Sequence, residues 1–278
     1  MIHTTFTREP RPGDVIRGDV RIPEGPPPRS AVVVVHGFKG FKDWGFFPHT
    51  CERLAAVGHS VVSFNMSHSG VGSDFQSFTD LKRFGANTLS LELEDVLSIL
   101  DDALTGDLLP RRPNQLGILG HSRGGGQAIL AAAEEHRVRA VATWAAVSHF
   151  DRWSDETKAE WRAEERIWVL NSRTGQQMPL DVGLLEDFEE NRDRLDILAA
   201  AAGLDRPWLI VHGAGDLTVR SDEALSLARA APNGRLVLVD GAGHTFEARH
   251  PFAGSTPALD RALDATVAHF ARHLSSRR

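Results

Sequence analysis

Short apolar runs alternate along the chain with longer segments in which apolar residues recur at helical spacing. This alternation is typical of parallel strands joined by crossover helices. The runs are too short for helices, and several are apolar throughout, as expected of strands that are buried on both faces of a sheet. Such strands are predicted at residues 31–35, 60–64, 116–119, 140–143, 208–211 and 236–239.

Helices are predicted between these strands, at residues 46–57, 87–104, 124–136, 222–231 and 258–274. In the second helix, leucine and valine side chains form one stripe, and Glu92, Glu94, Asp95 and Asp101 are expected on the other faces. The first twenty-five residues alternate weakly and predict antiparallel edge strands, which end before Pro26. We therefore expect an α/β fold with a mostly parallel central sheet and helices on both faces.

A segment rich in charge and tryptophan, residues 148–203, interrupts the alternation. Its middle predicts a hairpin of residues 166–171 and 176–180 with Gly175 in the turn, and its flanks, 155–165 and 184–202, are helical in pattern. Long insertions that leave a sheet near its loops commonly have a role, so we predict a lid subdomain within a single domain of residues 1–278. The alternative is that this insertion has no function of its own.

The pattern G-x-S-x-G occurs at Gly120, Ser122 and Gly124, directly after a predicted strand and directly before a helix of small residues. A serine in such a tight strand-to-helix turn is lifted above the sheet, and the glycines leave room for neighbouring backbone. The helix N-terminus favours developing negative charge. This context predicts a nucleophilic Ser122, and the alternative is a glycine-rich packing turn.

A serine nucleophile needs a general base and an acid that orients the base. His244 follows the last predicted strand on a glycine-flanked loop, and Asp216 follows the strand at 208–211, so both are expected at the same sheet edge as Ser122. Asp222 is expected to cap the next helix, which suffices to account for it. Asp240 is a second candidate for the orienting acid. The remaining histidines considered as bases are expected to be structural or solvated: His136, His212, His269 and His273.

Acyl transfer also needs two backbone N–H groups that stabilise an oxyanion. Arg123 supplies one because it follows the nucleophile, and Phe38 is predicted to supply the other because it lies in the loop after the strand at 31–35. For the His36-Gly37 pair within that loop, the alternative is a simple strand-ending turn.

These motifs, His36-Gly37, Gly120-x-Ser122-x-Gly124, Gly213-x-x-Asp216 and Gly243-His244, make the chain resemble an α/β-hydrolase from about residue 31 onward. Within that superfamily it is most similar to the dienelactone hydrolase-like and acylaminoacyl-peptidase-like serine hydrolases. The resemblance implies Ser122 as nucleophile, His244 as base, Asp216 as orienting acid, and the Phe38 and Arg123 amides as oxyanion donors. Dienelactone hydrolase itself uses cysteine where this chain has serine, and the insertion resembles in position the lid of feruloyl esterases.

The resemblance and the motifs together predict a serine esterase that acts through an acyl-enzyme on a small-molecule ester. An aminopeptidase or amidase with the same triad is the first alternative, and a non-catalytic ligand-binding protein on the same scaffold is the second. Aromatic residues near the predicted site either line its pocket or pack the lid on the body: Phe38, Phe41, Trp44, Phe47, Phe150 and Trp153.

Composition narrows the remaining classes of function. The chain has 278 residues and a formal net charge of −6, which favours neither nucleic acid nor an anionic membrane as a partner. Its single cysteine, Cys51, excludes an internal disulfide, and its lack of tyrosine excludes tyrosine-based mechanisms. No metal or organic cofactor is implied, and the N-terminal sequence lacks the pattern of a signal peptide, so a cytoplasmic location is expected. A homodimer remains an open alternative.

Overall fold

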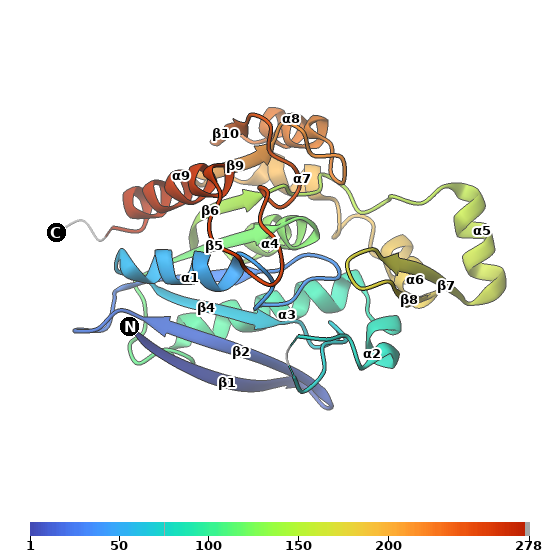
Figure 1. Cartoon of the computed structure of the whole chain (residues 1–278), viewed down its shortest axis with the longest axis horizontal. Helices are drawn as coiled ribbons and strands as arrows, with labels where there is room; N and C mark the ends of the chain where they lie inside the picture. The colour runs from blue at the N-terminus through green and yellow to red at the C-terminus, as the bar shows by residue number, and fades with distance from the viewer. Residues whose placement is uncertain (75, 276–278) are drawn as a thin grey trace.

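The central feature of the fold is an eight-stranded sheet, seen in a computed structural model that describes residues 1–74 and 76–275 (Figure 1). The strand order is β1-β2-β4-β3-β5-β6-β9-β10. The strands from β4 to β10 in this order are parallel, and β1 and β2 extend the sheet with antiparallel pairings. Their bounds are β1 (Ile2–Arg11), β2 (Asp14–Ile22), β3 (Ser30–Val35), β4 (Ser60–Asn65), β5 (Gln115–His121), β6 (Val138–Trp144), β9 (Trp208–Gly213) and β10 (Gly234–Val239).

Every strand predicted from an apolar run lies within one of these strands, and the predicted antiparallel edge is also confirmed. All residues of β3, β4 and β9 are buried, because helices cover both faces of the parallel part of the sheet. Among the described helices, none combines the length and the apolar composition that crossing a bilayer requires.

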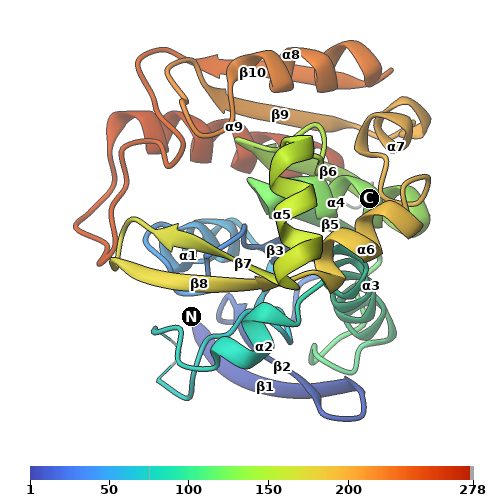
Figure 2. The same cartoon turned by 90° about the vertical axis from the view of Figure 1, so that its right-hand side faces the viewer.

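Helices pack on both faces and divide the core into two hydrophobic clusters. The first cluster includes α3 (Leu89–Thr105), α4 (Arg123–Glu134) and α8 (Ser221–Ala230), and the second includes α1 (Phe47–Ala56) and α9 (Pro257–His273). Figure 2 shows α1 and α9 on the side of the sheet opposite α3 and α4. One short helix, α2 (Leu81–Gly85), has no counterpart in the sequence prediction.

Two acidic side chains of helix α3 are buried, which its apolar stripe alone does not indicate. Glu92 is 4% exposed and Asp95 is 1% exposed. Glu92 accepts a hydrogen bond from the Asn87 amide at 2.6 Å, and Asp95 pairs with the Arg11 guanidinium at 2.5 Å. Partners from distant segments compensate the burial of these two carboxylates.

The insertion consists of α5 (Asp155–Glu164), β7 (Arg166–Asn171), β8 (Gln176–Asp181), α6 (Gly183–Glu190) and α7 (Ile197–Gly203). The hairpin of β7 and β8 and the helix α5 form as predicted. The single helix predicted at 184–202 is wrong, because the polar stretch 191–196 separates α6 from α7. Asn191 ends α6, and the Asp196 side chain caps α7 by accepting a hydrogen bond from the Ala199 amide at 2.9 Å.

The part of the insertion formed by residues 148–190 lies at one end of the sheet, and we call it the cap (Figures 1 and 2). Buried Trp161 holds the cap together, because its indole N–H donates to the Leu180 carbonyl at 2.8 Å and its ring meets Trp153 edge-on at 5.0 Å. Helix α7 instead packs on the body, where Ile197 approaches Gly126 of α4.

Helix α4 begins in direct contact with the end of β3. A Cβ atom added at Gly124 would meet the carbonyl oxygens of His36 and Val35, which are backbone atoms that cannot rotate away. The first turn of α4 therefore requires glycine in order to sit over the carboxyl end of β3.

We expect Gly124→Ala to lower the free energy of unfolding by about 1–3 kcal/mol, because the added methyl group forces the helix away from β3. Gly183→Ala is a matched control at the start of α6, where an added Cβ meets nothing within 4 Å. Urea denaturation of both variants measures the difference. Equal stability of the two variants would contradict the packing argument.

Candidate active site

Ser122 occupies a strained turn between β5 and α4. Its φ of 58° and ψ of −125° lie in a region that residues with a side chain rarely adopt. Neighbouring backbone holds this conformation, since the Ser122 amide donates to the Trp144 carbonyl at 2.9 Å and the Gly125 amide donates to the Ser122 carbonyl at 2.9 Å. The structure therefore contains the strand-serine-helix turn that the sequence predicts.

The predicted base and acid lie beside Ser122. His244 Nε2 is 3.0 Å from Ser122 Oγ, and His244 Nδ1 is 2.7 Å from Asp216 Oδ2. The loops that carry them leave the neighbouring strands β9 and β10, and the Gly215 amide donates to the Ala242 carbonyl at 2.9 Å to join the two loops. The structure thus brings together three residues that are far apart in the sequence.

Asp216 is buried and keeps its negative charge. Its Oδ1 accepts hydrogen bonds from the Thr218 amide at 2.8 Å and the Val219 amide at 3.0 Å. Burial acts to raise the pKa of Asp216, but the hydrogen bond and charge interaction with His244, followed by the two amides, outweigh it and hold the pKa below its ordinary value. An ionised Asp216 fixes the His244 tautomer that carries its proton on Nδ1 and leaves Nε2 to face Ser122.

Two further histidines surround the site without facing the serine hydroxyl. The His121 ring donates from Nε2 to the His244 carbonyl at 2.9 Å, and the His212 ring donates from Nε2 to the Val219 carbonyl at 2.8 Å. Burial, and then the charge of His244, lower the pKa of His121 to about 3, and burial also lowers the pKa of His212. Both rings are therefore neutral near pH 7 and hold backbone that carries His244 and Asp216.

The two predicted oxyanion residues lie in segments next to Ser122. A Cβ added at Gly37 would lie 2.9 Å from the Ser122 Cβ, so the loop after β3 passes directly beside the serine. Arg123 is the first residue of α4, and the amides of the first turn of a helix have no intrahelical acceptor. The Arg123 guanidinium lies 3.9 Å from the centroid of the Phe38 ring, which links the two segments.

Sequence reasoning missed the buried network that supports Arg123. The Arg123 guanidinium donates to Glu92 Oε1 at 3.3 Å, and the Gln127 amide donates to Glu92 Oε2 at 3.1 Å. Gln127 is the one long polar residue in an otherwise small and apolar part of α4, and this is a signal that could have indicated a buried partner. Sequence reasoning also missed that His121 supports the backbone of His244. The signal for this was weaker, since it consists of the position of His121 directly before Ser122.

A cavity of about 740 Å³ opens onto Ser122 and His244. All six aromatic residues singled out in the sequence line it: Phe38, Phe41, Trp44, Phe47, Phe150 and Trp153. Phe150 of the cap also packs against the body, because a Cβ added at Gly126 of α4 would lie 3.2 Å from its ring, and the Trp44 ring of the body lies 4.9 Å from the Arg173 guanidinium of the cap. The two readings left open by the sequence therefore coexist.

Other residues weighed as catalytic groups lie apart from this cavity. Asp222 is exposed in the first turn of α8, and Asp240 is exposed after β10. The His269 and His273 rings lie against each other on α9 in a tilted arrangement, and His136 contacts Arg206. Within residues 1–74 and 76–275, no three side chains of His, Cys, Asp or Glu group as a metal site.

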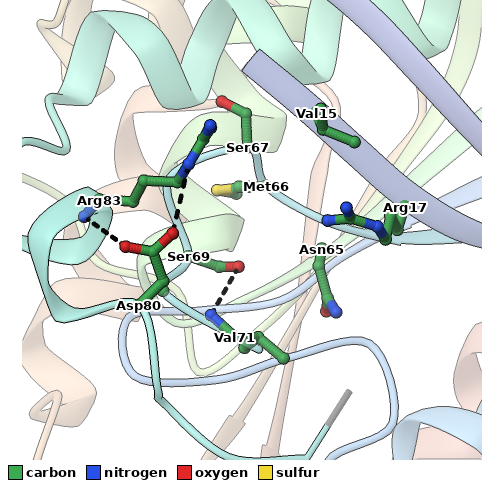
Figure 3. Close-up of a pocket in the computed structure, with 10 residues that line it drawn as sticks. Val15, Arg17, Asn65, Met66, Ser67, Ser69, Val71, Asp80 and Arg83 are labelled. Atoms are coloured by element: carbon green, nitrogen blue, oxygen red, sulfur yellow. Dashed lines mark hydrogen bonds and ion pairs between the residues drawn. The ribbon is translucent and has the colours of Figure 1, made fainter. Parts of the chain in front are cut away.

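A second, smaller cavity of about 210 Å³ lies between β2, the end of β4 and α2 (Figure 3). Asp80 and Arg83 form an ion pair at 3.3 Å in its wall, and the Ser69 hydroxyl accepts from the Val71 amide at 3.5 Å. None of the predicted site residues lines this cavity. Four of the predicted site residues line the larger cavity instead: Phe38, Ser122, Arg123 and His244.

Comparison of backbones places the fold among the α/β-hydrolases. An esterase domain from Rhodothermus marinus matches with a TM-score of 0.67 and 21% identity over 99% of this chain and 100% of that chain. Est1E from Butyrivibrio proteoclasticus, solved with ferulic acid bound, matches with a TM-score of 0.72 and 18% identity over 94% of this chain and 96% of that chain. Likeness at these identities establishes the fold class, which confirms the predicted architecture.

The chain belongs to the dienelactone hydrolase family, whose sequence model matches residues 16–166. A relative, 2,6-dihydropseudooxynicotine hydrolase from Paenarthrobacter nicotinovorans, is 30% identical over 227 residues, which are 80% of this chain and 54% of that protein. The chain spans about half the length of the curated relatives it matches. The resemblance drawn from the motifs is thereby confirmed at the level of the family.

Histidine ordinarily has a pKa of 6.5, and burial lowers the pKa of His121 to about 3. We therefore expect the His121 ring to stay neutral while the pH falls from 6.5 to about 3. The folded state then binds fewer protons than the unfolded state in this interval, so His121 lowers the free energy of unfolding as the pH falls through it. Ring-proton chemical shifts measured against pH, with His121→Gln used for assignment, test this. A His121 resonance that titrates near pH 6.5 would contradict the burial argument.

Proposed function

We propose that the protein is a serine hydrolase that cleaves carboxylic esters of small molecules through an acyl-enzyme on Ser122. The observation that carries this proposal is the continuous hydrogen-bonded chain from Ser122 Oγ to His244 at 3.0 Å and from His244 to Asp216 at 2.7 Å. Serine, histidine and an ionised aspartate in this order are the groups that activate a hydroxyl for acyl transfer.

In the first half of the reaction, His244 Nε2 takes the proton of the Ser122 hydroxyl as Oγ forms a bond to the ester carbonyl carbon. The carbonyl oxygen becomes an oxyanion, for which we propose the Phe38 and Arg123 amides as donors. The closeness of the Gly37-Phe38 segment and of Arg123 to Ser122 supports this assignment. The carbon–oxygen bond to the alcohol then breaks, and the His244 imidazolium returns its proton to the departing alcohol.

In the second half, His244 Nε2 accepts a proton from water, and the water oxygen attacks the acyl carbon. Collapse of this second tetrahedral intermediate releases the carboxylic acid and restores the proton to Ser122 Oγ. Asp216 remains ionised throughout and stabilises the imidazolium that forms in each half. Its two backbone donors and its pKa below the ordinary value support that role.

We further propose that the insertion predicted at residues 148–203 acts as the lid of this site within a single hydrolase domain. Its residues Phe150 and Trp153 line the cavity that contains Ser122, as do Asn171 and Arg173 of the hairpin turn. A cavity of about 740 Å³ lies within the range that holds small organic molecules. The esterase domain of Rhodothermus marinus, which shares the fold, supports ester cleavage as the reaction to test first.

Incubation with a fluorophosphonate should add one phosphonyl group to the wild-type protein and none to Ser122→Ala, because only an activated serine attacks the phosphorus. Intact-mass spectrometry measures the adduct, and circular dichroism checks that the variant keeps its fold. Wild-type protein that turns over p-nitrophenyl esters faster than aminoacyl p-nitroanilides supports an esterase. Labelling that persists in Ser122→Ala would rule out this nucleophile.

Asp216→Asn should lower kcat by about 10³ to 10⁴-fold, because the amide no longer stabilises the imidazolium and can present its N–H to His244 in place of an acceptor. Asp222→Asn is the matched control, since Asp222 is exposed on α8 and away from the cavity. Steady-state kinetics on one ester measure both variants. A loss of less than tenfold in Asp216→Asn would assign the orienting role to another group.

A further inference from the structure

The two amides proposed as oxyanion donors belong to separate segments of the chain. The Phe38 amide lies in the loop after β3, and the Arg123 amide lies in the first turn of α4. Among the residues that the structure describes, neither amide donates a hydrogen bond. Two donors stabilise an oxyanion together only when both lie about 2.7–3.1 Å from its position, so the spacing between the two segments must be fixed.

The direction of the Phe38 amide is fixed within its own loop. The Gly37 carbonyl accepts a hydrogen bond from the Gly40 amide at 3.0 Å and a second from His36 Nδ1 at 2.9 Å. His36 Nε2 accepts from the Met66 amide at 3.3 Å, so the ring proton lies on Nδ1. Because a trans peptide group directs its carbonyl and its N–H in opposite directions, the Phe38 N–H points away from these two donors. These bonds set the direction of the Phe38 amide and leave its distance from α4 to other contacts.

A side-chain contact joins the loop after β3 to the start of α4, beyond the backbone contact between His36 and Gly124. The Arg123 guanidinium lies 3.9 Å from the centroid of the Phe38 ring, a distance at which a cation and an aromatic face attract each other. Lys39 Nζ lies farther from the same ring, at 5.3 Å. The contact thus connects the two residues that carry the proposed donors, and the place of the Arg123 side chain influences the spacing of their amides.

A buried carboxylate from a third segment holds the Arg123 side chain in this place. Glu92 of α3 is 4% exposed, and its Oε1 accepts from the Arg123 guanidinium at 3.3 Å and from the Asn87 amide at 2.6 Å. Its Oε2 accepts from the Gln127 amide at 3.1 Å. A long arginine side chain loses rotamer freedom when it is held in one place, and the attraction to a buried carboxylate compensates that cost. Glu92 therefore favours the rotamer that puts the guanidinium against the Phe38 ring.

We propose that Glu92 is a positioning residue for the oxyanion: through the Arg123 guanidinium it holds the Phe38 ring, and hence the Phe38 amide, at the required distance from the Arg123 amide. Glu92 is buried and does not line the cavity that contains Ser122, so it acts through Arg123 and does not touch the substrate. Its contribution belongs to the transition state, in which the oxyanion forms, and not to the binding of a neutral ester. This inference rests on the proposed acyl transfer at Ser122.

The test compares two inhibitors of the same length, hexyl trifluoromethyl ketone and hexyl methyl ketone. With the first, Ser122 Oγ bonds to the carbonyl carbon, the serine proton passes to His244, and the carbonyl oxygen becomes an oxyanion. The methyl ketone binds without forming a stable adduct. In Glu92→Gln, we expect kcat/KM for p-nitrophenyl butyrate to fall about 10- to 100-fold and the Ki of the trifluoromethyl ketone to rise by the same factor. The Ki of the methyl ketone should stay within about twofold of the wild-type value, because no oxyanion forms.

Two further variants test the contact between the guanidinium and the ring. In Arg123→Lys, the ammonium group cannot lie flat on the Phe38 ring while it pairs with Glu92, and Phe38→Leu keeps both amides but removes the ring. Both variants should reproduce the selective loss of trifluoromethyl ketone binding. Glu94→Gln is the matched control, because Glu94 lies on the same helix and pairs with Arg11 at 3.2 Å in a more exposed position. It should leave kcat/KM and both inhibition constants unchanged.

The outcomes separate this inference from the proposed function. Equal rises in the Ki of both ketones in Glu92→Gln would indicate a distorted cavity and overturn the positioning role, as would wild-type constants in that variant or the same selective loss in Glu94→Gln. Labelling of Ser122 by the fluorophosphonate would leave the serine hydrolase intact in each case. If circular dichroism shows that Glu92→Gln does not fold, Arg123→Lys and Phe38→Leu decide with the same two ketones, and wild-type constants in both overturn the role. If the wild-type protein neither hydrolyses the ester nor reacts with the fluorophosphonate, the proposed function fails and the positioning role fails with it.

Discussion

The site depends on how closely the first turn of α4 approaches the carboxyl end of β3. Gly124 has no side chain to keep the helix away from the His36 carbonyl, and this contact sets where the helix can start. Ser122 must then turn sharply, with φ at 58°, to connect β5 to the helix. The same approach brings Gly37 beside the Ser122 side chain, so one packing contact positions both the serine and the loop that faces it.

Hydrogen bonds then determine which imidazole faces the serine. Burial keeps the pKa of His121 and of His212 below their ordinary values, and their rings act as donors to backbone carbonyls. His244 is more accessible, and it alone among these three lies between Ser122 Oγ and the Asp216 carboxylate. Desolvation thus distinguishes two buried rings that hold backbone from the one ring that contacts Ser122.

The sequence predicts what depends on neighbours along the chain and misses what depends on distant partners. The buried strands and the turn around Ser122 follow from local patterns, and the three loop residues of the site follow from the rule that parallel strands end at one edge. The burial of Glu92 and Asp95 does not follow from the local pattern, because their partners Gln127 and Arg11 lie far away in the sequence. The sequence pattern does not show the break between α6 and α7, because the residues at 191–196 also fit a solvent-exposed face of one helix.

The cap contributes charge to the cavity in a way that no local pattern reveals. Lys39 and Arg173 hold the hairpin turn against the loop after β3, but each uses a neutral carbonyl as acceptor, so these contacts do not cancel their charge.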